Sequence, residues 1–203
     1  MNCTGRGNRK RICEEYDVQA IGCIVLYGGR TVISDAGGKV IRDKYYKFLC
    51  VNKGDGHREF IQCGYPTAKH ICELSGIQLP AEFNPFVGEG NNGGGAGGGQ
   101  NVRPMNRGRK QLDNAIMLFV TAKDEILGPE TAIFKIKERV EKDMYNDVDF
   151  GDVKAVNTIL GKFYTTMSQI IADLGMHGTV RNYNFNILHN MLNEKQIFPN
   201  NYI

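Results

Sequence analysis

Long hydrophobic runs are missing from this sequence of 203 residues. A transmembrane helix needs about 20 predominantly apolar residues, and the longest apolar run here, residues 115–122, is less than half of that length. The polar, basic N-terminus also lacks the hydrophobic core of a signal peptide. We therefore expect a cytoplasmic protein with no membrane-embedded segment.

Nucleotide-binding motifs in the right context are also missing. The chain has no G-x4-G-K-[ST] loop, and residues 88–93 match the letters of G-x-G-x-x-G only inside a glycine tract. That pattern binds a dinucleotide because it follows a strand and opens a helix, whereas more Gly, Ala and Gln follow here. The sequence therefore does not support a nucleotide-binding enzyme.

Glycine, by contrast, is abundant and unevenly placed. Eight of the 25 glycines lie within residues 88–99, where ordering the backbone costs much entropy and buries little area. We expect a flexible Gly-rich linker over residues 87–111, between one domain at 1–86 and another at 112–203. Such a tether raises the effective concentration of two modules for a shared partner.

Charge is divided along the chain in a similar way. The net charge is +3 for residues 1–86, +3 for 87–111 and −3 for 112–203. Basic side chains concentrate in two short glycine-containing runs, at residues 6–11 and 103–110. These two runs are the segments that a polyanion would meet first.

Strand-forming residues dominate the first predicted domain. Residues 18–27, 31–33, 45–51 and 57–62 predict an antiparallel β-meander, with two glycines after the first strand in a tight hairpin turn. Pro66 is well placed to begin a short helix that Gly76 ends. The predicted fold class is α+β, with an antiparallel meander and a short helix in the first domain and a helical bundle in the second.

Helical periodicity dominates the second predicted domain. Apolar residues predict helices at 112–120, at 129–144 and near 187–192, and the longest expected helix spans 152–174, with acidic residues at 147–152 capping its start. Such apolar faces must bury themselves, so a small helical bundle is expected. The same faces are the alternative interface for a protein partner or for a second copy of the chain.

Cysteine and histidine residues in the first domain form a candidate metal site. All six cysteines precede the glycine tract, and in a reducing cytosol we expect thiols or metal ligands and no disulfides. No two of these residues have the two-residue gap of strong zinc motifs. Zinc is still a candidate cofactor, and the alternative is that the cysteines are packing residues. The candidate ligands are Cys50, Cys63, His70 and Cys72.

The same residues also suggest an enzymatic alternative. Cys63 or Cys72 would be a nucleophile activated by His57 or His70. No third, orienting residue can be named from the sequence, and catalytic pairs usually come from distant segments. A small enzyme with its site in the first domain is therefore the second interpretation.

The two basic runs are the candidate nucleic-acid contacts. Arg107-Gly108-Arg109-Lys110 resembles the core of AT-hook peptides, in which an extended Arg-Gly-Arg enters the minor groove, but it lacks the proline that usually follows. Mobile cationic segments neutralise phosphates and add salt-sensitive affinity. Alternatively, they keep the chain in solution or dock on the acidic bundle. The candidate residues are Arg6, Arg9, Lys10, Arg11, Arg103, Arg107, Arg109 and Lys110.

These observations together favour a binding protein over an enzyme. The expected function is that of a non-enzymatic adaptor, which links a protein assembly to nucleic acid through basic flexible segments. The protein partner, or a second copy of the chain, is expected on the helical bundle.

Overall fold

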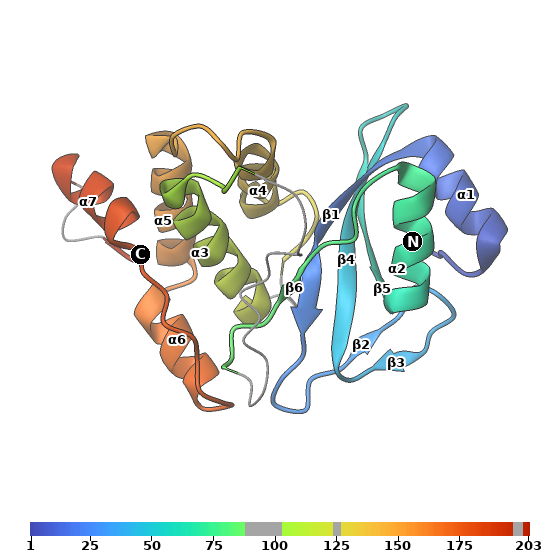
Figure 1. The fold of residues 1–203 in the computed structure, drawn as a ribbon, viewed down its shortest axis with the longest axis horizontal. Helices are drawn as coiled ribbons and strands as arrows, with labels where there is room; N and C mark the ends of the chain where they lie inside the picture. The colour runs from blue at the N-terminus through green and yellow to red at the C-terminus, as the bar shows by residue number, and fades with distance from the viewer. Residues whose placement is uncertain (88–102, 124–126, 197–200) are drawn as a thin grey trace. The chain divides into compact units, whose positions relative to one another are not determined.

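The computed structural model of the protein describes residues 1–87, 103–123, 127–196 and 201–203. These ranges contain seven helices, a four-stranded sheet and a two-stranded sheet (Figure 1). The chain divides into two compact units, Met1–Asn84 and Pro85–Ile203. The predicted mixture of α and β structure is confirmed, while the glycine tract at 88–102 lies outside the described residues.

The first unit begins with a helix that we did not expect. The basic run at 6–11 was predicted to be a mobile segment, and it lies inside a regular helix because arginine, lysine and glutamate favour helix formation and Ile12 is buried. The predicted strands of the first domain are confirmed, and so is the predicted helix that contains Pro66. The elements are α1 (Gly5–Glu15), β1 (Tyr16–Val25), β2 (Val32–Ile33), β3 (Val40–Ile41), β4 (Lys44–Asn52), β5 (Arg58–Cys63), α2 (Tyr65–Ser75) and β6 (Glu82–Phe83).

The strand pairing differs from a simple meander. The sheet has the order β5-β4-β1-β6, in which β1 pairs antiparallel with β4 and parallel with β6. The predicted hairpin between β1 and β2 is wrong, since β2 pairs with β3. Gly28 and Gly29 do turn the chain with positive φ, but β1 has ten residues and β2 only two. The nine-residue strand β4 gives β1 a partner of matching length.

Helices α1 and α2 cover one face of this sheet (Figure 1). The core between them contains Ile12 from α1 and Ile71 from α2, packed with Phe48 and Ile61 from the strands. Tyr46, Phe48 and Cys50 alternate along β4 in this core, as the two-residue period of a strand requires. The sheet therefore holds α1, and the basic run on it, in a fixed orientation within the first unit.

The second unit is helical, as predicted. Helix α3 contacts α4, α6 and α7, and its residues 115–120 are all buried. No helix within the described ranges is long and apolar enough to cross a membrane. The helices are α3 (Arg107–Lys123), α4 (Ala132–Lys142), α5 (Phe150–Lys162), α6 (Met167–Gly175) and α7 (Asn186–Glu194).

The longest predicted helix is divided into two. It was expected to run unbroken from 152 to 174, but α5 ends at Lys162 and α6 begins at Met167. Tyr164 has a φ of 51°, and the Thr166 side chain begins α6 in a capping box with Gln169. Asp149 caps α5 by accepting a hydrogen bond from the backbone N–H of Asp152. An acidic residue therefore caps this helix, as expected. The capping residue is Asp149, one turn before Asp152, where the predicted helix began.

Candidate nucleic-acid interface

The second basic run forms the first turn of α3. The predicted linker extends to residue 111, yet α3 begins at Arg107. The Asn106 side chain caps this start, because its Oδ1 accepts hydrogen bonds from the backbone N–H groups of Gly108 at 2.8 Å and Arg109 at 3.3 Å. The extended conformation that the AT-hook resemblance implies is therefore wrong for these residues.

Arg109 is turned inward and fixes the position of α3. It is 5% exposed, and its guanidinium donates hydrogen bonds of 3.0 to 3.2 Å to the carbonyl oxygens of Arg139, Asn146 and Asp147. A five-donor guanidinium is well suited to joining several carbonyls in this way. Arg109 is therefore a structural residue, and its predicted contact with phosphate is wrong.

Gly108 allows α3 to approach the loop before α5 closely. A Cβ atom at this position would lie 2.6 Å from Cγ1 of Val148, which is closer than real contacts allow. Gly108 and Arg109 together hold the α3 start against the segment that leads into α5. Gly108 and Arg109 therefore serve packing, while Arg107 and Lys110 on either side of them remain at the surface.

Arg107 and Lys110 line a cavity in the second unit. This α3–α7 cavity has a volume of about 490 Å³ and is formed by the start of α3, the segment before α7 and the start of α7. Both cations are exposed, and Arg107 forms no ion pair with any residue that the structure describes. Lys110 lies 3.2 Å from Asp113. Two of the eight predicted nucleic-acid contacts thus share one cavity.

Five carboxamide side chains line the same cavity. The Gln111 side chain already has a hydrogen-bond partner in the second unit, because its Oε1 accepts a hydrogen bond from the backbone N–H of Ile187 at 3.0 Å. Asn184 likewise accepts from the backbone N–H of Asn186 at 2.9 Å. Asn114 and Asn182 have side chains without a hydrogen-bond partner among the described residues. These two amides leave both donors and acceptors for a ligand. The five are Gln111, Asn114, Asn182, Asn184 and Asn186.

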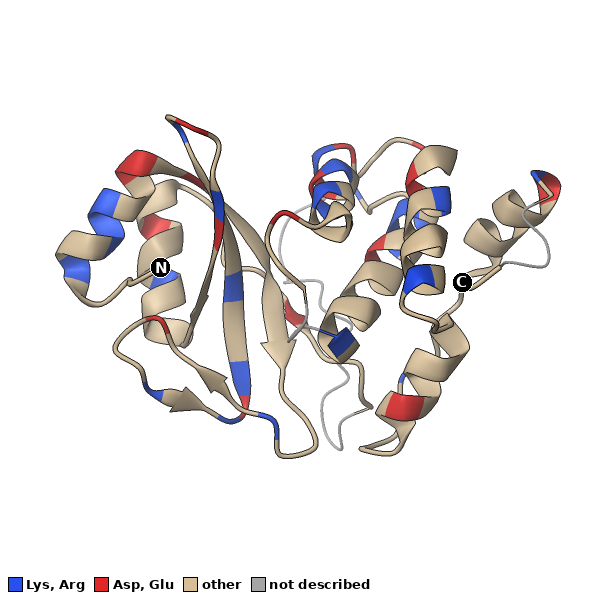
Figure 2. Cartoon of the chain, turned by 180° about the vertical axis from the view of Figure 1, so that it is seen from behind, with Lys and Arg blue, Asp and Glu red and all other residues tan. Residues whose placement is uncertain are grey.

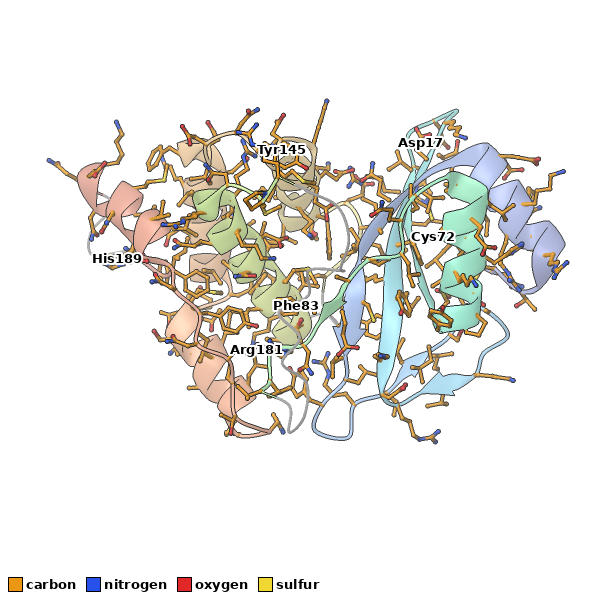
Figure 3. All side chains as sticks on the ribbon, viewed as in Figure 1. Asp17, Cys72, Phe83, Tyr145, Arg181 and His189 are labelled. Atoms are coloured by element: carbon orange, nitrogen blue, oxygen red, sulfur yellow. The ribbon has the colours of Figure 1, made fainter. Side chains whose placement is uncertain are left out.

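Tyr183 adds an aromatic ring to the cavity lining. Its ring lies nearly parallel to that of Phe185, with an interplanar angle of 6° and 6.4 Å between the centroids. Burial raises the pKa of the Tyr183 hydroxyl, and the charge of Arg181 (Figure 3) offsets part of that rise. The side chain therefore stays neutral at physiological pH and does not repel an anion.

A buried charge network lies behind Lys110. Lys137 is 2.7 Å from Asp113 and 2.8 Å from Glu141. Burial alone would raise the pKa of Asp113, but Lys137 and Lys110 hold it below its usual value. Burial alone would lower the pKa of Lys137, and the two carboxylates raise it instead. Lys110 is therefore positioned by a carboxylate that stays ionised at neutral pH.

Arg103 lies outside this network and before α3. Its guanidinium carbon is 5.3 Å from the ring centroid of Tyr145 (Figure 3), a cation–π distance. The Tyr145 side chain is 40% exposed. Arg103 is thus a surface cation in the second unit, although it does not line the α3–α7 cavity.

The first basic run lies in α1, where Figure 2 shows basic residues in blue along the helix. Arg6 and Arg11 are exposed, and Lys10 forms an exposed ion pair of 3.7 Å with Glu14. Arg9 is turned toward the unit, where it donates to the Cys3 carbonyl at 3.2 Å and lies 3.2 Å from Nδ1 of His70. Three of these four cations therefore remain at the surface.

The predicted zinc ligands do not form a metal site. Among the described residues, no group of three or more Cys, His, Asp or Glu side chains is placed to hold a metal ion. Cys50, Cys63 and Cys72 (Figure 3) are buried, and burial raises the pKa of all three thiols, that of Cys50 to about 12. Protonated, buried thiols are poor nucleophiles as well as poor metal ligands. The geometry thus favours the packing role of these cysteines.

A second cationic cavity lies in the first unit, and the sequence analysis did not identify it. This sheet cavity has a volume of about 510 Å³ and is lined by Lys39, Arg42 and Lys44. Lys44 is engaged by Glu82 at 2.7 Å. Three basic residues within residues 39–44 were the available signal, but their spacing in a turn region does not show that they share a cavity.

Comparison of the chain with family models, curated proteins and solved structures finds no match.

Proposed function

We propose that the protein is a non-enzymatic adaptor that binds nucleic acid at the α3–α7 cavity. The observation that carries this proposal is that Arg107 and Lys110 line one cavity on a helix start that Arg109 anchors. Cations on a backbone that is already held in place lose less conformational freedom on meeting a phosphate than cations on a mobile segment. This placement supports a built binding site more than the mobile, purely electrostatic contact that the sequence predicts.

The remaining lining of the cavity fits nucleic acid better than a simple anion. Phosphate contacts orient a nucleic acid, whereas amide and aromatic groups contact its bases. The α3–α7 cavity offers two cations, carboxamides such as Asn114 and Asn182, and the ring of Tyr183. A free inorganic anion would use the cations and leave the other groups without a role.

The exposed cations of α1 add a second, weaker contact. Arg6, Lys10 and Arg11 lie on a helix surface and have no cavity of their own among those described. We expect them to neutralise phosphates without sequence preference, which lowers the dissociation constant at low salt and adds little at high salt.

The direct test is the salt dependence of binding to a fluorescent single-stranded oligonucleotide. The double variant Arg107→Gln, Lys110→Gln should weaken binding by about tenfold at low salt, because two phosphate contacts are lost. The slope of log K against log salt should become shallower by about 1.4. The matched control is Lys39→Gln, Arg42→Gln, which removes the same charge from the sheet cavity.

Two results would contradict this assignment. Equal losses in the test and control variants would mean that overall charge, and not the α3–α7 cavity, determines binding. Absence of binding by the unmodified protein at low salt would remove nucleic acid from the proposal altogether.

The adaptor part of the proposal concerns a protein partner on the second unit. Two large apolar side chains there, Tyr164 and Met176, are 92% and 75% exposed. Such side chains are the usual anchors of protein interfaces. The variant Tyr164→Ser, Met176→Ser should therefore weaken self-association, or retention of a co-purifying protein, without changing oligonucleotide binding. Unchanged association would show that the partner binds elsewhere.

A further inference from the structure

The α3–α7 cavity has the dimensions of a small-molecule site. Ligand pockets typically measure about 300–1,000 Å³, and this cavity measures about 490 Å³. In a duplex the faces of each base are covered by its stacked neighbours, and only its edges are exposed in the grooves. A base can enter a concave cavity only when it is unpaired or extruded from the stack.

The free carboxamides provide hydrogen-bond partners suited to a base edge. Asn114 and Asn182 each offer an amide donor and a carbonyl acceptor, and neither is used within the described residues. Asparagine is a common partner of bases because this donor–acceptor pair can match the edge of adenine. Asn114 is half-buried on α3 and Asn182 is exposed, so a ligand in the cavity can reach both amides. Both side chains therefore point to a polar, planar ligand.

Tyr183 supplies a surface on which such a base can stack. It lines the cavity, and the parallel ring of Phe185 restricts its rotation. Stacking on an aromatic side chain is tolerant of sequence because every base has a π-face. Arg107 and Lys110 line the same cavity and can contact the phosphates of the strand that carries the base.

We infer that the α3–α7 cavity binds one unpaired base of a single strand, with the Asn114 and Asn182 amides on the base edge and Tyr183 against its face. This inference rests on the proposed nucleic-acid binding and adds the class of ligand. The protein should accordingly prefer single-stranded to double-stranded nucleic acid of the same sequence.

The test compares one oligonucleotide, single-stranded and annealed to its complement, by fluorescence anisotropy at fixed salt. The substitution Tyr183→Ala should weaken single-strand binding by about tenfold through loss of stacking, whereas Tyr183→Phe, which keeps the ring, should stay within about twofold. Duplex binding should not change in either variant. Asn182→Ala should weaken single-strand binding severalfold, and it keeps the fold because Asn182 is exposed.

The outcomes separate the inference from the proposed function. If Arg107→Gln, Lys110→Gln weakens binding while Tyr183→Ala and Asn182→Ala do not, the nucleic-acid site stands and the unpaired base is excluded. If none of these variants alters binding, the proposed function fails as well. Adenosine monophosphate that binds as tightly as the oligonucleotide would overturn the inference in favour of a free nucleotide.

Discussion

In both basic runs of this protein a helix contains all of the cations except Arg103, and in both one arginine turns away from solvent. Arg9 in α1 is partly buried, and it contacts one carbonyl and one imidazole. Arg109 in α3 is almost fully buried and donates to three carbonyl groups. Similar runs of basic residues can therefore differ in how much they contribute to the folded structure. An arginine inside such a run can also be the cation that is least available to phosphate.

The largest difference between the two arginines is expected in their contribution to protein stability. Arg109→Gln removes a buried guanidinium that donates to three carbonyl groups, and it should lower the free energy of unfolding by about 4 kcal/mol. Arg9→Gln should cost about 1 kcal/mol, because its contacts are fewer and partly exposed. Urea denaturation followed by circular dichroism measures both. Equal losses of unfolding free energy would show that the two arginines contribute equally to stability.

The next largest difference in stability is expected between the carboxylates that pair with the two basic runs. Asp113→Asn removes one of the two carboxylates that pair with buried Lys137 and should cost about 3 kcal/mol at pH 7. Glu14→Gln breaks only the exposed pair with Lys10 and should cost about 0.3 kcal/mol.

The pH dependence of the Asp113 effect follows from its pKa. Since the folded protein holds this pKa below its ordinary value, the carboxylate contributes stability above about pH 4. That contribution is lost as the pH falls through the lower, folded pKa. The difference between Asp113→Asn and the unmodified protein should therefore shrink in acid. A difference that stays constant down to pH 2 would contradict the ion-pair explanation.

The glycines of the two runs should give effects of opposite sign. Gly108→Ala places a Cβ atom 2.6 Å from Val148 and should cost about 2 kcal/mol through overpacking. A Cβ at Gly7 meets no atom within 4 Å, so Gly7→Ala in α1 should stabilise the protein by about 0.5 kcal/mol. Thermal unfolding of the two variants checks both signs. Stabilisation by Gly108→Ala would mean that α3 is not packed closely on its neighbouring loop.

Local signals in the sequence predicted much of the fold. Pro66 and Gly76 placed α2 correctly, and the strands predicted at 45–51 and 57–62 correspond to β4 and β5. The pairing of β1 with β4 was not predictable from the glycine turn, because strand partners depend on matching lengths and faces far apart in the chain. The break between α5 and α6 had a local signal in the sequence, the Thr-x-x-Gln capping box at Thr166. The continuous apolar periodicity favoured one long helix instead, and the prediction followed it.

The candidate site was predictable only in part. Charge pattern identified Arg107 and Lys110, but it assigned the same role to Arg109, since burial of a guanidinium depends on carbonyl groups about thirty residues or more away in the sequence. The carboxamides at 182–186 lie about 60 residues beyond the end of α3 and carry no charge. Nothing in a one-dimensional pattern connects them to the basic run.

The chain segments on both sides of the glycine tract belong to the second unit. Phe86 forms a β-bridge with Val180, Arg181 donates to the Phe86 carbonyl at 3.0 Å, and α3 follows the tract on the other side. The covalent connection between the units is therefore at residues 84–85, ahead of the tract. A protease that cuts among the glycines would therefore divide the second unit itself. The segment around Phe86 would stay covalently attached to the first unit, and noncovalent contacts such as the Phe86–Val180 bridge would have to hold it to the helices of its own unit.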